Sequence, residues 1–303
     1  MRPARSMVAA FVTLVAIAFV PFAEAREVTH AMAVTDVPDA PQRIVILTNE
    51  GTEALLHLGV APIGAVQSWY GDPWYDHLAE GLVATIPLGT ESAVDLERLA
   101  ALEPDLIIGS KVRQEKIYGQ LSAIAPTVFS ETIGGVWREN YALYADALGL
   151  ADEGAADLAA FDQRVARLRQ SLGEAVDEDI SLVRFSPGRT RLYFRDTFAG
   201  VILSDIGFKR PPAQDKPGVG EEIGKERIPD MAGDRIFYFA DADAESAAYL
   251  ADWTSEPLWQ GLPAVEEGKA HAADNLIWNA GIGIYCAHML LDDIAEVYGV
   301  PAP

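Results

Sequence analysis

Short apolar runs alternate with amphipathic stretches along most of the chain. In the first half, apolar runs that predict β-strands occupy 43–48, 62–67, 85–90, 105–110 and 126–129. In the second half they occupy 180–186, 190–194, 234–240 and 270–278. Strands that alternate with helical patterns favour parallel sheets covered by helices. We therefore predict an α/β fold with two parallel-sheet α/β lobes, 42–149 and 178–303.

A long helical pattern separates the two halves. Its apolar positions step by three or four residues and are Leu158, Phe161, Val165, Leu168 and Leu172. Charged residues fill the other face, and Gly173 ends the pattern. The spacing predicts a helix over 150–173, roughly 30 Å long. Such a helix suits a single bridge between two lobes, although a peripheral helix of one domain has the same pattern.

A weak internal repeat relates the halves. The segment VDLERLAALEPDLIIG, 94–109, resembles IGKERIPDMAGDRIFYF, 223–239. Each reads Glu-Arg, an apolar residue, a helical stretch, an acidic turn and an apolar strand. The repeat places Glu97 and Glu226 at matching positions, each on an exposed helical face, where a solvated carboxylate is the ordinary interpretation.

The first 25 residues have the pattern of a secretory signal. Arg2 and Arg5 precede an apolar run over 7–20, and Ala23-Glu24-Ala25 fits a cleavage site. An N-terminal membrane anchor is the alternative, but 14 apolar residues are fewer than the roughly 20 that cross a bilayer. The only cysteine, Cys286, lies far from this segment. We therefore expect a protein exported to the periplasm that is not a lipoprotein.

The chain is strongly acidic, with 23 Lys plus Arg against 45 Asp plus Glu and a formal net charge of −22. This balance argues against nucleic acid and anionic membranes as partners. It also makes any local cluster of basic residues informative. Cys286 lies in an apolar helical pattern and is expected to be a buried small hydrophobic residue.

Sequence motifs exclude several classes of site. No P-loop pattern and no G-x-S-x-G nucleophile elbow occur, and the two glycine-rich segments have the wrong spacing for dinucleotide binding. The five histidines show neither H-E-x-x-H nor the spacing of a zinc site. We therefore expect no enzyme activity, no cofactor and no metal held directly by the protein.

Basic and aromatic residues instead follow the predicted strands, where ligands bind in open α/β sheets. These candidates are Trp69, Tyr70 and Trp74 after the second strand, Lys111 and Arg113 after the fourth, Arg184 near the end of 180–186, and Trp278 after the last. Arginine offers a planar fork of donors for anionic oxygens, and aromatic rings supply apolar area. The pattern predicts a bulky, anionic and partly apolar ligand. For any one of these residues alone, a helix cap, a salt bridge or a core position is an equally good interpretation.

Long segments of the chain also resemble a known family. PQRIVIL, GTEALLHLGVAPIGAV, DLERLAALEPDLIIGSKVRQEKIYGQLSAIAPTVF, LVRFSPGRTRLY, FAGVILSDIGFKRP and SEPLWQGLPAVEEGKAH resemble the iron–siderophore substrate-binding proteins of ABC importers, of the FecB/FhuD type. The resemblance covers nearly all of the chain after residue 25. It departs from the family in NAGIGIYCA, where relatives often carry a glycine pair.

The resemblance implies two α/β lobes on one rigid helix, with a ferric siderophore in the cleft between them. The siderophore would coordinate the iron, and Arg113, Arg184 and Trp278 would contact the chelate. Trp69, Trp74, Tyr70 and Lys111 would line the first lobe. The resemblance favours a hydroxamate or citrate–hydroxamate siderophore.

The resemblance also implies partners. Glu97 and Glu226 would dock on the permease of an ABC transporter, one acid on each lobe, and we expect a monomer. Two alternatives remain: a haem or cobalamin binder on the same scaffold, and an exported α/β hydrolase, which the missing nucleophile elbow disfavours.

Overall fold

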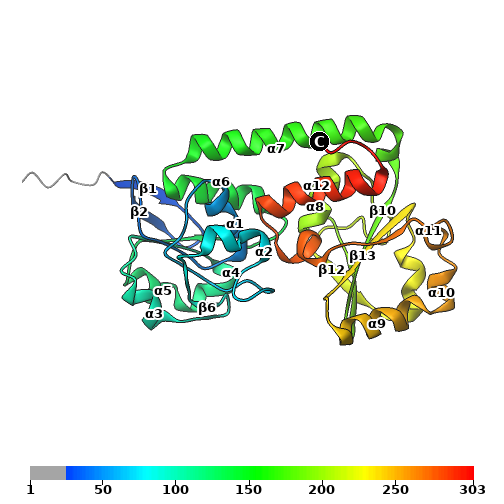
Figure 1. Ribbon diagram of the computed structural model, residues 1–303, viewed down its shortest axis with the longest axis horizontal. Coiled ribbons are helices and arrows are strands. Elements are labelled where there is room, and N and C mark those ends of the chain that lie inside the picture. The colour runs from blue at the N-terminus through cyan, green and yellow to red at the C-terminus, as the bar shows by residue number, and fades with distance from the viewer. Residues whose placement is uncertain (1–24) are drawn as a thin grey trace, which may run out of the picture.

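The computed structural model describes residues 25–303 and contains two α/β lobes beneath one long helix (Figure 1). The signal predicted over 1–25 therefore lies, except for Ala25, outside the described residues. The described chain begins with an antiparallel hairpin of β1 (Ala25–Thr29) and β2 (Val34–Pro38), which the sequence reasoning did not predict.

The first lobe contains a five-stranded sheet in the order β5-β4-β3-β8-β9, with every neighbouring pair parallel. Its strands are β3 (Ile44–Ile46), β4 (Gly64–Ala65), β5 (Ile86–Pro87), β8 (Leu106–Ser110) and β9 (Thr127–Ser130). A small pair, β6 (Gly89–Thr90) and β7 (Ala93–Val94), lies between β5 and β8 in the chain. The helices of this lobe are α1 (Asn49–His57), α2 (Asp76–Ala79), η1 (Glu80–Leu82), α3 (Leu96–Ala101), α4 (Lys111–Gln114), η2 (Glu115–Ile117), α5 (Tyr118–Ser122) and α6 (Trp137–Leu148).

The second lobe has a mixed sheet in the order β12-β11-β10-β13-β14. Its strands are β10 (Ile180–Ser186), β11 (Arg189–Tyr193), β12 (Gly220–Ile223), β13 (Arg235–Ala240) and β14 (Ala270–Ala272). β10, β13 and β14 pair in parallel, whereas β10, β11 and β12 form antiparallel pairs. The predicted α/β class is confirmed, and the antiparallel hairpin at the sheet edge is an addition to it.

The remaining helices cover this second sheet and connect it to the first lobe. They are η3 (Gly173–Asp177), α8 (Phe198–Ile206), η4 (Lys225–Met231), α9 (Ala244–Thr254), α10 (Pro257–Gln260), α11 (Pro263–Glu266), η5 (Leu276–Ala280) and α12 (Ile284–Tyr298). The last predicted strand, 270–278, is wrong in its second half. β14 ends at Ala272, and the chain then forms η5, a single π-helical turn closed by the bond from Gly281 N–H to the Leu276 carbonyl, 2.8 Å.

The long helix α7 (Ala151–Leu172) spans both lobes, as Figure 1 shows. Its 22 residues extend about 33 Å. It packs against α6 of the first lobe and against α8 and α12 of the second. The left-handed φ of +57° at Gly173 ends the helix where the sequence predicts it. We propose that 42–149 and 178–303 are the two structural units that α7 joins.

The two sheets share one hydrophobic core beneath α7. Strand alternation directs Ile44 and Ile46 of β3 and Leu182 of β10 into this common core, together with Phe161 of α7. The opposite faces of the sheets form separate clusters, one containing Val45 and the other Val183, Phe185 and Ile236. The lobes are therefore fused through packed side chains as well as through the helix.

Within the part of the chain that the structure describes, no helix combines the length and the apolar composition that spanning a bilayer requires.

Candidate functional site

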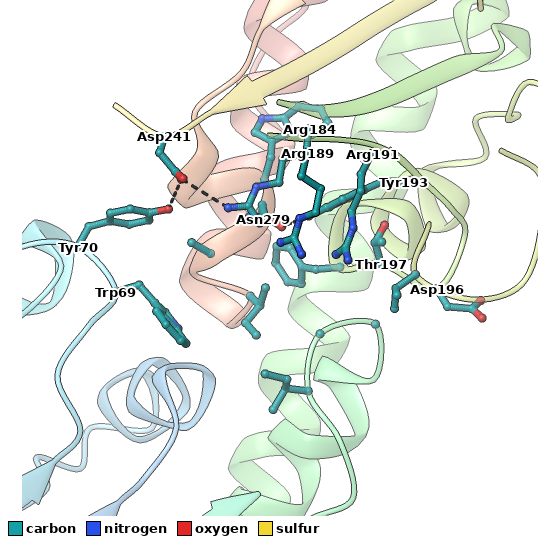
Figure 2. Close-up of a pocket in the computed structure, with 18 of the residues that line it drawn as sticks. Trp69, Tyr70, Arg184, Arg189, Arg191, Tyr193, Asp196, Thr197, Asp241 and Asn279 are labelled. Atoms are coloured by element: carbon teal, nitrogen blue, oxygen red, sulfur yellow. Dashed lines mark hydrogen bonds and ion pairs between the residues drawn. The ribbon is translucent and has the colours of Figure 1, made fainter. Parts of the chain in front are cut away.

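A cleft of about 700 Å³ lies between the two lobes. Figure 2 shows its arginines on the second lobe facing two aromatic residues of the first. The cleft is lined by Trp69, Tyr70, Arg113, Ile133, Gly134, Gly135, Arg184, Arg189, Arg191, Tyr193, Asp196, Thr197, Phe198, Val219, Asp241, Trp278, Asn279, Ala280 and Ile282. Its size suits a bulky small molecule.

The β10–β11 hairpin brings three arginines to one wall of the cleft. In the antiparallel register, Arg184 lies directly opposite Arg191, and Ser186 lies opposite Arg189. Like charges at opposed positions of a sheet are destabilising, and the free-energy cost is about 0.2–1 kcal/mol. Acids offset part of this repulsion, because Glu222 pairs with Arg189 and Arg191 and Asp241 pairs with Arg184. The hairpin still gathers three guanidinium groups on one wall of the cleft, which is expected of a surface that binds an anion.

Arg184 pairs with Asp241, whose carboxylate accepts hydrogen bonds from both lobes. Its Nη2 lies 3.6 Å from Asp241 Oδ1. The hydroxyl of Tyr70, on the opposite lobe, donates to the same oxygen at 2.6 Å (Figure 2). Asn275 Nδ2 donates to it as well, at 2.6 Å. Burial, and then the hydrogen bond to Asp241, raise the pKa of Tyr70, so its hydroxyl stays protonated. Arg184 Nε is buried and has no hydrogen-bond partner within residues 25–303.

Arg113 and Trp69 form the facing wall. The Arg113 guanidinium lies 5.7 Å from the centroid of the Trp69 ring, within cation–π range. Its Nε lies 3.1 Å from Glu91 Oε2, and this carboxylate is buried. The other oxygen of Glu91 accepts from the Asn49 backbone N–H at 2.8 Å. Arg113 is therefore fixed at its base, and more than half of the Trp69 side chain remains exposed.

The short helix α4 carries Arg113 because Gln114 anchors it. The buried Gln114 amide donates to the carbonyls of Leu47 and Glu91, at 3.0 and 2.8 Å. Its oxygen accepts from the Ser110 backbone N–H at 2.9 Å. These bonds connect the ends of β3 and β8 with the segment that carries Glu91, so the first turn after β8 has a fixed direction.

Lys111 does not lie in the cleft, contrary to the sequence prediction. Lys111 is absent from the cleft lining, and its Nζ pairs with Glu131 at 2.7 Å. It lies beside a neighbouring surface hollow of about 640 Å³, which Arg113 lines as well.

Trp74 and Trp278 are both buried, and the structure corrects the predicted place of Trp74 on the cleft wall. Trp74 packs in the common core and is absent from the cleft lining. Trp278 is among the residues that line the cleft, but it has an exposed fraction of 0%, stacks on Phe237 at a centroid distance of 4.4 Å, and donates its indole N–H to Asp293. The predicted contact of Trp278 with a ligand therefore stays a prediction.

The cleft also contains polar residues that the sequence reasoning did not choose. Arg189 and Arg191 alternate on β11, and this period of two was a visible signal that both share one face. Tyr193 continues that face and donates its hydroxyl to Asn279 Oδ1 at 2.8 Å. Asp241 follows β13 in the sequence with no pattern that marks it.

The structure places Glu97 on α3 and Glu226 on η4, and both side chains are exposed. Each helix precedes the strand that pairs in parallel with the first strand of its lobe, β8 with β3 and β13 with β10. The internal repeat therefore corresponds to equivalent helix–strand units. Neither carboxylate forms an ion pair with any residue of 25–303.

Three comparisons place the chain among known proteins. It is 48% identical over 284 residues to the "Probable siderophore-binding lipoprotein YfiY" of Bacillus subtilis (strain 168), covering 90% of this chain and 87% of that protein. It is 31% identical to the achromobactin-binding periplasmic protein of Dickeya dadantii (strain 3937), covering 86% and 87%. The crystal structure of Staphylococcus aureus SirA complexed with staphyloferrin B superposes with a TM-score of 0.86 at 34% identity, covering 92% of this chain and all of that one.

The similarity to YfiY corrects the predicted location. That relative is a lipoprotein, so the prediction of a periplasmic protein that is not a lipoprotein is wrong. The prediction rested on the apolar leader and on the position of the single cysteine. A leader of that kind is common to both classes of exported protein and does not distinguish them.

A family model described as periplasmic binding protein matches residues 44–275. This range includes both five-stranded sheets, α7 and all the arginines of the cleft, and it leaves out the β1–β2 hairpin. The chain therefore belongs to the periplasmic binding protein family.

Proposed function

We propose that this protein captures a ferric siderophore in the cleft between its lobes and delivers it to an ABC permease for iron uptake, without catalysing a reaction. The carrying observation is the positive wall of the β10–β11 hairpin, in which Arg184 and Arg191 are directly opposed. Trp69 and Arg113 face that wall across the cleft. The iron is cargo, and the chelate is the group that the protein contacts.

The arginines support a carboxylate-bearing chelate, of citrate–hydroxamate or wholly citrate type. A guanidinium fork matches a carboxylate with two parallel hydrogen bonds, whereas a ferric complex of three hydroxamates carries no net charge to attract it. Two relatives are in keeping with a siderophore ligand, since one is named for achromobactin and the SirA structure holds staphyloferrin B.

Local charge can outweigh the acidity of the whole chain. The formal net charge is −22, but surface fields are screened over roughly 8–10 Å. An arginine 4 Å from an anionic oxygen contributes about 4 kcal/mol of Coulomb energy at an effective dielectric of 20, before desolvation. The anion therefore responds mainly to the charges of the cleft, where Arg113, Arg184, Arg189 and Arg191 outnumber the lining acids Asp196 and Asp241.

Replacing Arg184 with Ala is expected to weaken binding of a ferric citrate–hydroxamate by about 10- to 100-fold, because a charge-assisted hydrogen bond contributes about 1.5–3 kcal/mol. Arg113→Ala should weaken it by a similar factor. Arg184→Lys should lie between, since it keeps the charge and loses the fork. Isothermal titration calorimetry on the purified protein measures these affinities.

Arg195→Ala is the matched control, because Arg195 pairs with Asp215 at 3.3 Å outside the cleft lining. The panel includes ferric citrate, a trihydroxamate, a tris-catecholate, haem and cobalamin. Tightest binding of the tris-catecholate or the trihydroxamate would contradict the carboxylate class and keep the siderophore function. Binding of haem or cobalamin alone would replace that function.

We propose further that Glu97 and Glu226 are the permease contacts, one from each lobe. Both are exposed, lie in equivalent units of the two halves, and have no ion pair within residues 25–303 to compete with a basic partner. Removing one partner of a buried charge pair at an interface typically weakens the binding free energy by a few kcal/mol.

Glu226→Ala is expected to weaken association with the permease by about 2 kcal/mol, roughly 30-fold, and to leave siderophore affinity unchanged. Glu97→Ala should weaken association with the permease by a similar amount. Binding to the reconstituted permease and stimulation of its ATPase measure the effect. Glu153→Ala, at an exposed position on α7, is the control. Normal ATPase stimulation in the Glu97→Ala/Glu226→Ala double variant would exclude the proposed docking residues.

A further inference from the structure

Three side chains with metal-binding atoms converge where the lobes meet. Glu53 comes from α1, His77 from α2 and Cys286 from α12, and one ligand atom from each lies within 4.8 Å of the other two. Figure 1 shows α12 reaching back from the second lobe to α1 and α2. The cluster is separate from the cleft, since none of the three lines it.

The cluster leaves buried polar atoms without hydrogen bonds. Glu53 has no exposed side-chain area, and its Oε2 accepts from the Cys286 backbone N–H at 3.0 Å. Its other oxygen, Oε1, has no hydrogen-bond partner among residues 25–303, and neither does His77 Nε2. The two atoms face each other at 3.6 Å, a separation too long for a hydrogen bond. A buried carboxylate oxygen without a hydrogen bond lowers the stability of the fold unless another group, such as a cation, binds to it.

The separations suit a cation at the centre of the cluster. Three atoms that all lie within 4.8 Å of one another place a central cation within about 2.8 Å of each, against zinc bond lengths of roughly 2.0–2.3 Å to oxygen, nitrogen and sulfur. Contraction of less than about 1 Å would therefore complete three bonds, and a water could occupy the fourth position of a tetrahedron.

Neighbouring residues shape the cluster. The Tyr75 ring stacks on His77 with an interplanar angle of 10° and so orients the imidazole. A Cβ atom at Gly283 would lie 2.6 Å from Glu53 Oε2, and one at Gly281 would collide with Cys286 Sγ. Only glycine at these two positions leaves room for the carboxylate and the thiol. The His77 side chain keeps an exposed fraction of 13%, which gives an ion a path from solvent.

A simple buried ion pair is the alternative interpretation. It would account for Glu53 and His77 but not for the convergence of a thiol from the other lobe. An oxygen, a nitrogen and a sulfur ligand form the mixed set that favours zinc over magnesium or calcium, which prefer all-oxygen sites. On binding, the thiol would release its proton to solvent and the resulting thiolate would bond the metal.

We propose that Glu53, His77 and Cys286 form a Zn²⁺ site that fastens α12 of the second lobe to α1 and α2 of the first. The ion is structural and separate from the transported iron. Two of the ligands come from the first lobe and one from the second. The ion would therefore cross-link the lobes and should resist their relative movement.

The test is competition of the metal-stripped protein with a chromophoric zinc chelator, followed by thermal unfolding with and without Zn²⁺. We expect one Zn²⁺ per chain and a higher unfolding midpoint when it is bound. Cys286→Ala and His77→Gln should each weaken zinc binding by more than about 100-fold, beyond the 10- to 100-fold loss typical of outer-shell changes. Mg²⁺ should give no shift.

His271→Gln is the matched control, because His271 lies on the edge strand β14 and should leave zinc affinity unchanged. Circular dichroism without metal establishes that each variant is folded, and His77→Gln carries the test if Cys286→Ala is not. Absence of stoichiometric zinc binding by the native protein would overturn the proposal. Equal zinc affinity in the native protein and folded His77→Gln would overturn it as well.

Discussion

Replacing Trp278 with Ala is expected to lower the free energy of unfolding by about 3–5 kcal/mol, the range for truncation of a buried large aromatic residue. Trp278 is fully buried, stacks on Phe237 and loses its indole hydrogen bond to Asp293 when truncated. Trp278→Phe should cost less, because it retains the ring and loses only the N–H donor. Urea unfolding followed by far-UV circular dichroism measures the differences.

Trp69→Ala is the counterpart to this experiment. More than half of the Trp69 side chain is exposed, so its truncation should change the free energy of unfolding by less than about 1 kcal/mol while weakening ligand binding. A loss of ligand binding without a loss of stability on replacing Trp278 would support the ligand contact that the sequence predicts for it. A folded Trp278→Phe protein of native stability that no longer binds siderophore would be that result.

Between pH 4.5 and pH 8 the free energy of unfolding should fall by about 5 kcal/mol more in the native protein than in Glu50→Gln. Burial, opposed by hydrogen bonds from Gly134 and Asn140 and assisted by the nearby Glu91, raises the pKa of Glu50 from 4.5 to about 8. Glu50 is buried in α1, and it fastens Gly134 of the cleft lining through a 3.1 Å hydrogen bond.

The sign follows from the raised pKa. Below pH 4.5 Glu50 is protonated in both the folded and unfolded chains, and the stability that its neutral form contributes is fully present. As the pH rises to about 8, the unfolded chain ionises while the folded one does not, so the native protein loses about 1.4 kcal/mol per pH unit. Glutamine does not titrate and lacks this loss.

Urea unfolding of both proteins at several pH values from 4.5 to 8.5 gives the difference directly, because other groups titrate equally in the two chains. The Glu50 carboxyl accepts hydrogen bonds from Gly134 and Asn140 with its two oxygens, and a glutamine side chain has only one oxygen. The lost hydrogen bond lowers the stability of the variant by a constant amount at every pH. Glu139→Gln, on the exposed side of α6, controls for the chemical change. Parallel pH profiles for the native protein and Glu50→Gln would contradict the expected titration.

The periodicity of the sequence predicted most of the fold, because buried strands and amphipathic helices leave strong local patterns. The positions of the five strands of the first lobe along the chain and the extent of α7 followed from it. The antiparallel hairpin β10–β11 did not, although Pro187 and Gly188 between two apolar runs are a turn signal. Alternation with helices argued for parallel pairing, and the local turn determined the topology at the sheet edge.

Individual site residues were less predictable. Arg113 and Arg184 lie in the cleft because a strand end fixes each one. Lys111 shared the same local sequence but lies outside the cleft lining, beside a hollow that Arg113 also lines. An aromatic residue after a strand is equally typical of a core and of a cleft. The burial of Trp278 results from its packing against Phe237, and the local sequence does not predict that contact.

Convergence over long distances lies beyond a reading of one sequence. Glu53 and Cys286 are 233 residues apart and meet only because α12 returns to the first lobe. Tyr70 and Asp241, separated by 171 residues, meet across the cleft for a comparable reason. Neither pair has spacing that a motif could detect.

The shared core beneath α7 has a consequence for the kinetics of uptake. Lobes that are packed together can only slide by small amounts, so Glu97 and Glu226 keep nearly the same separation whether the cleft is empty or filled. On the docking proposed above, unloaded molecules then compete with loaded ones for each transporter. Overproducing the protein in iron-poor medium should therefore slow import, and flux should follow the loaded fraction rather than the total amount.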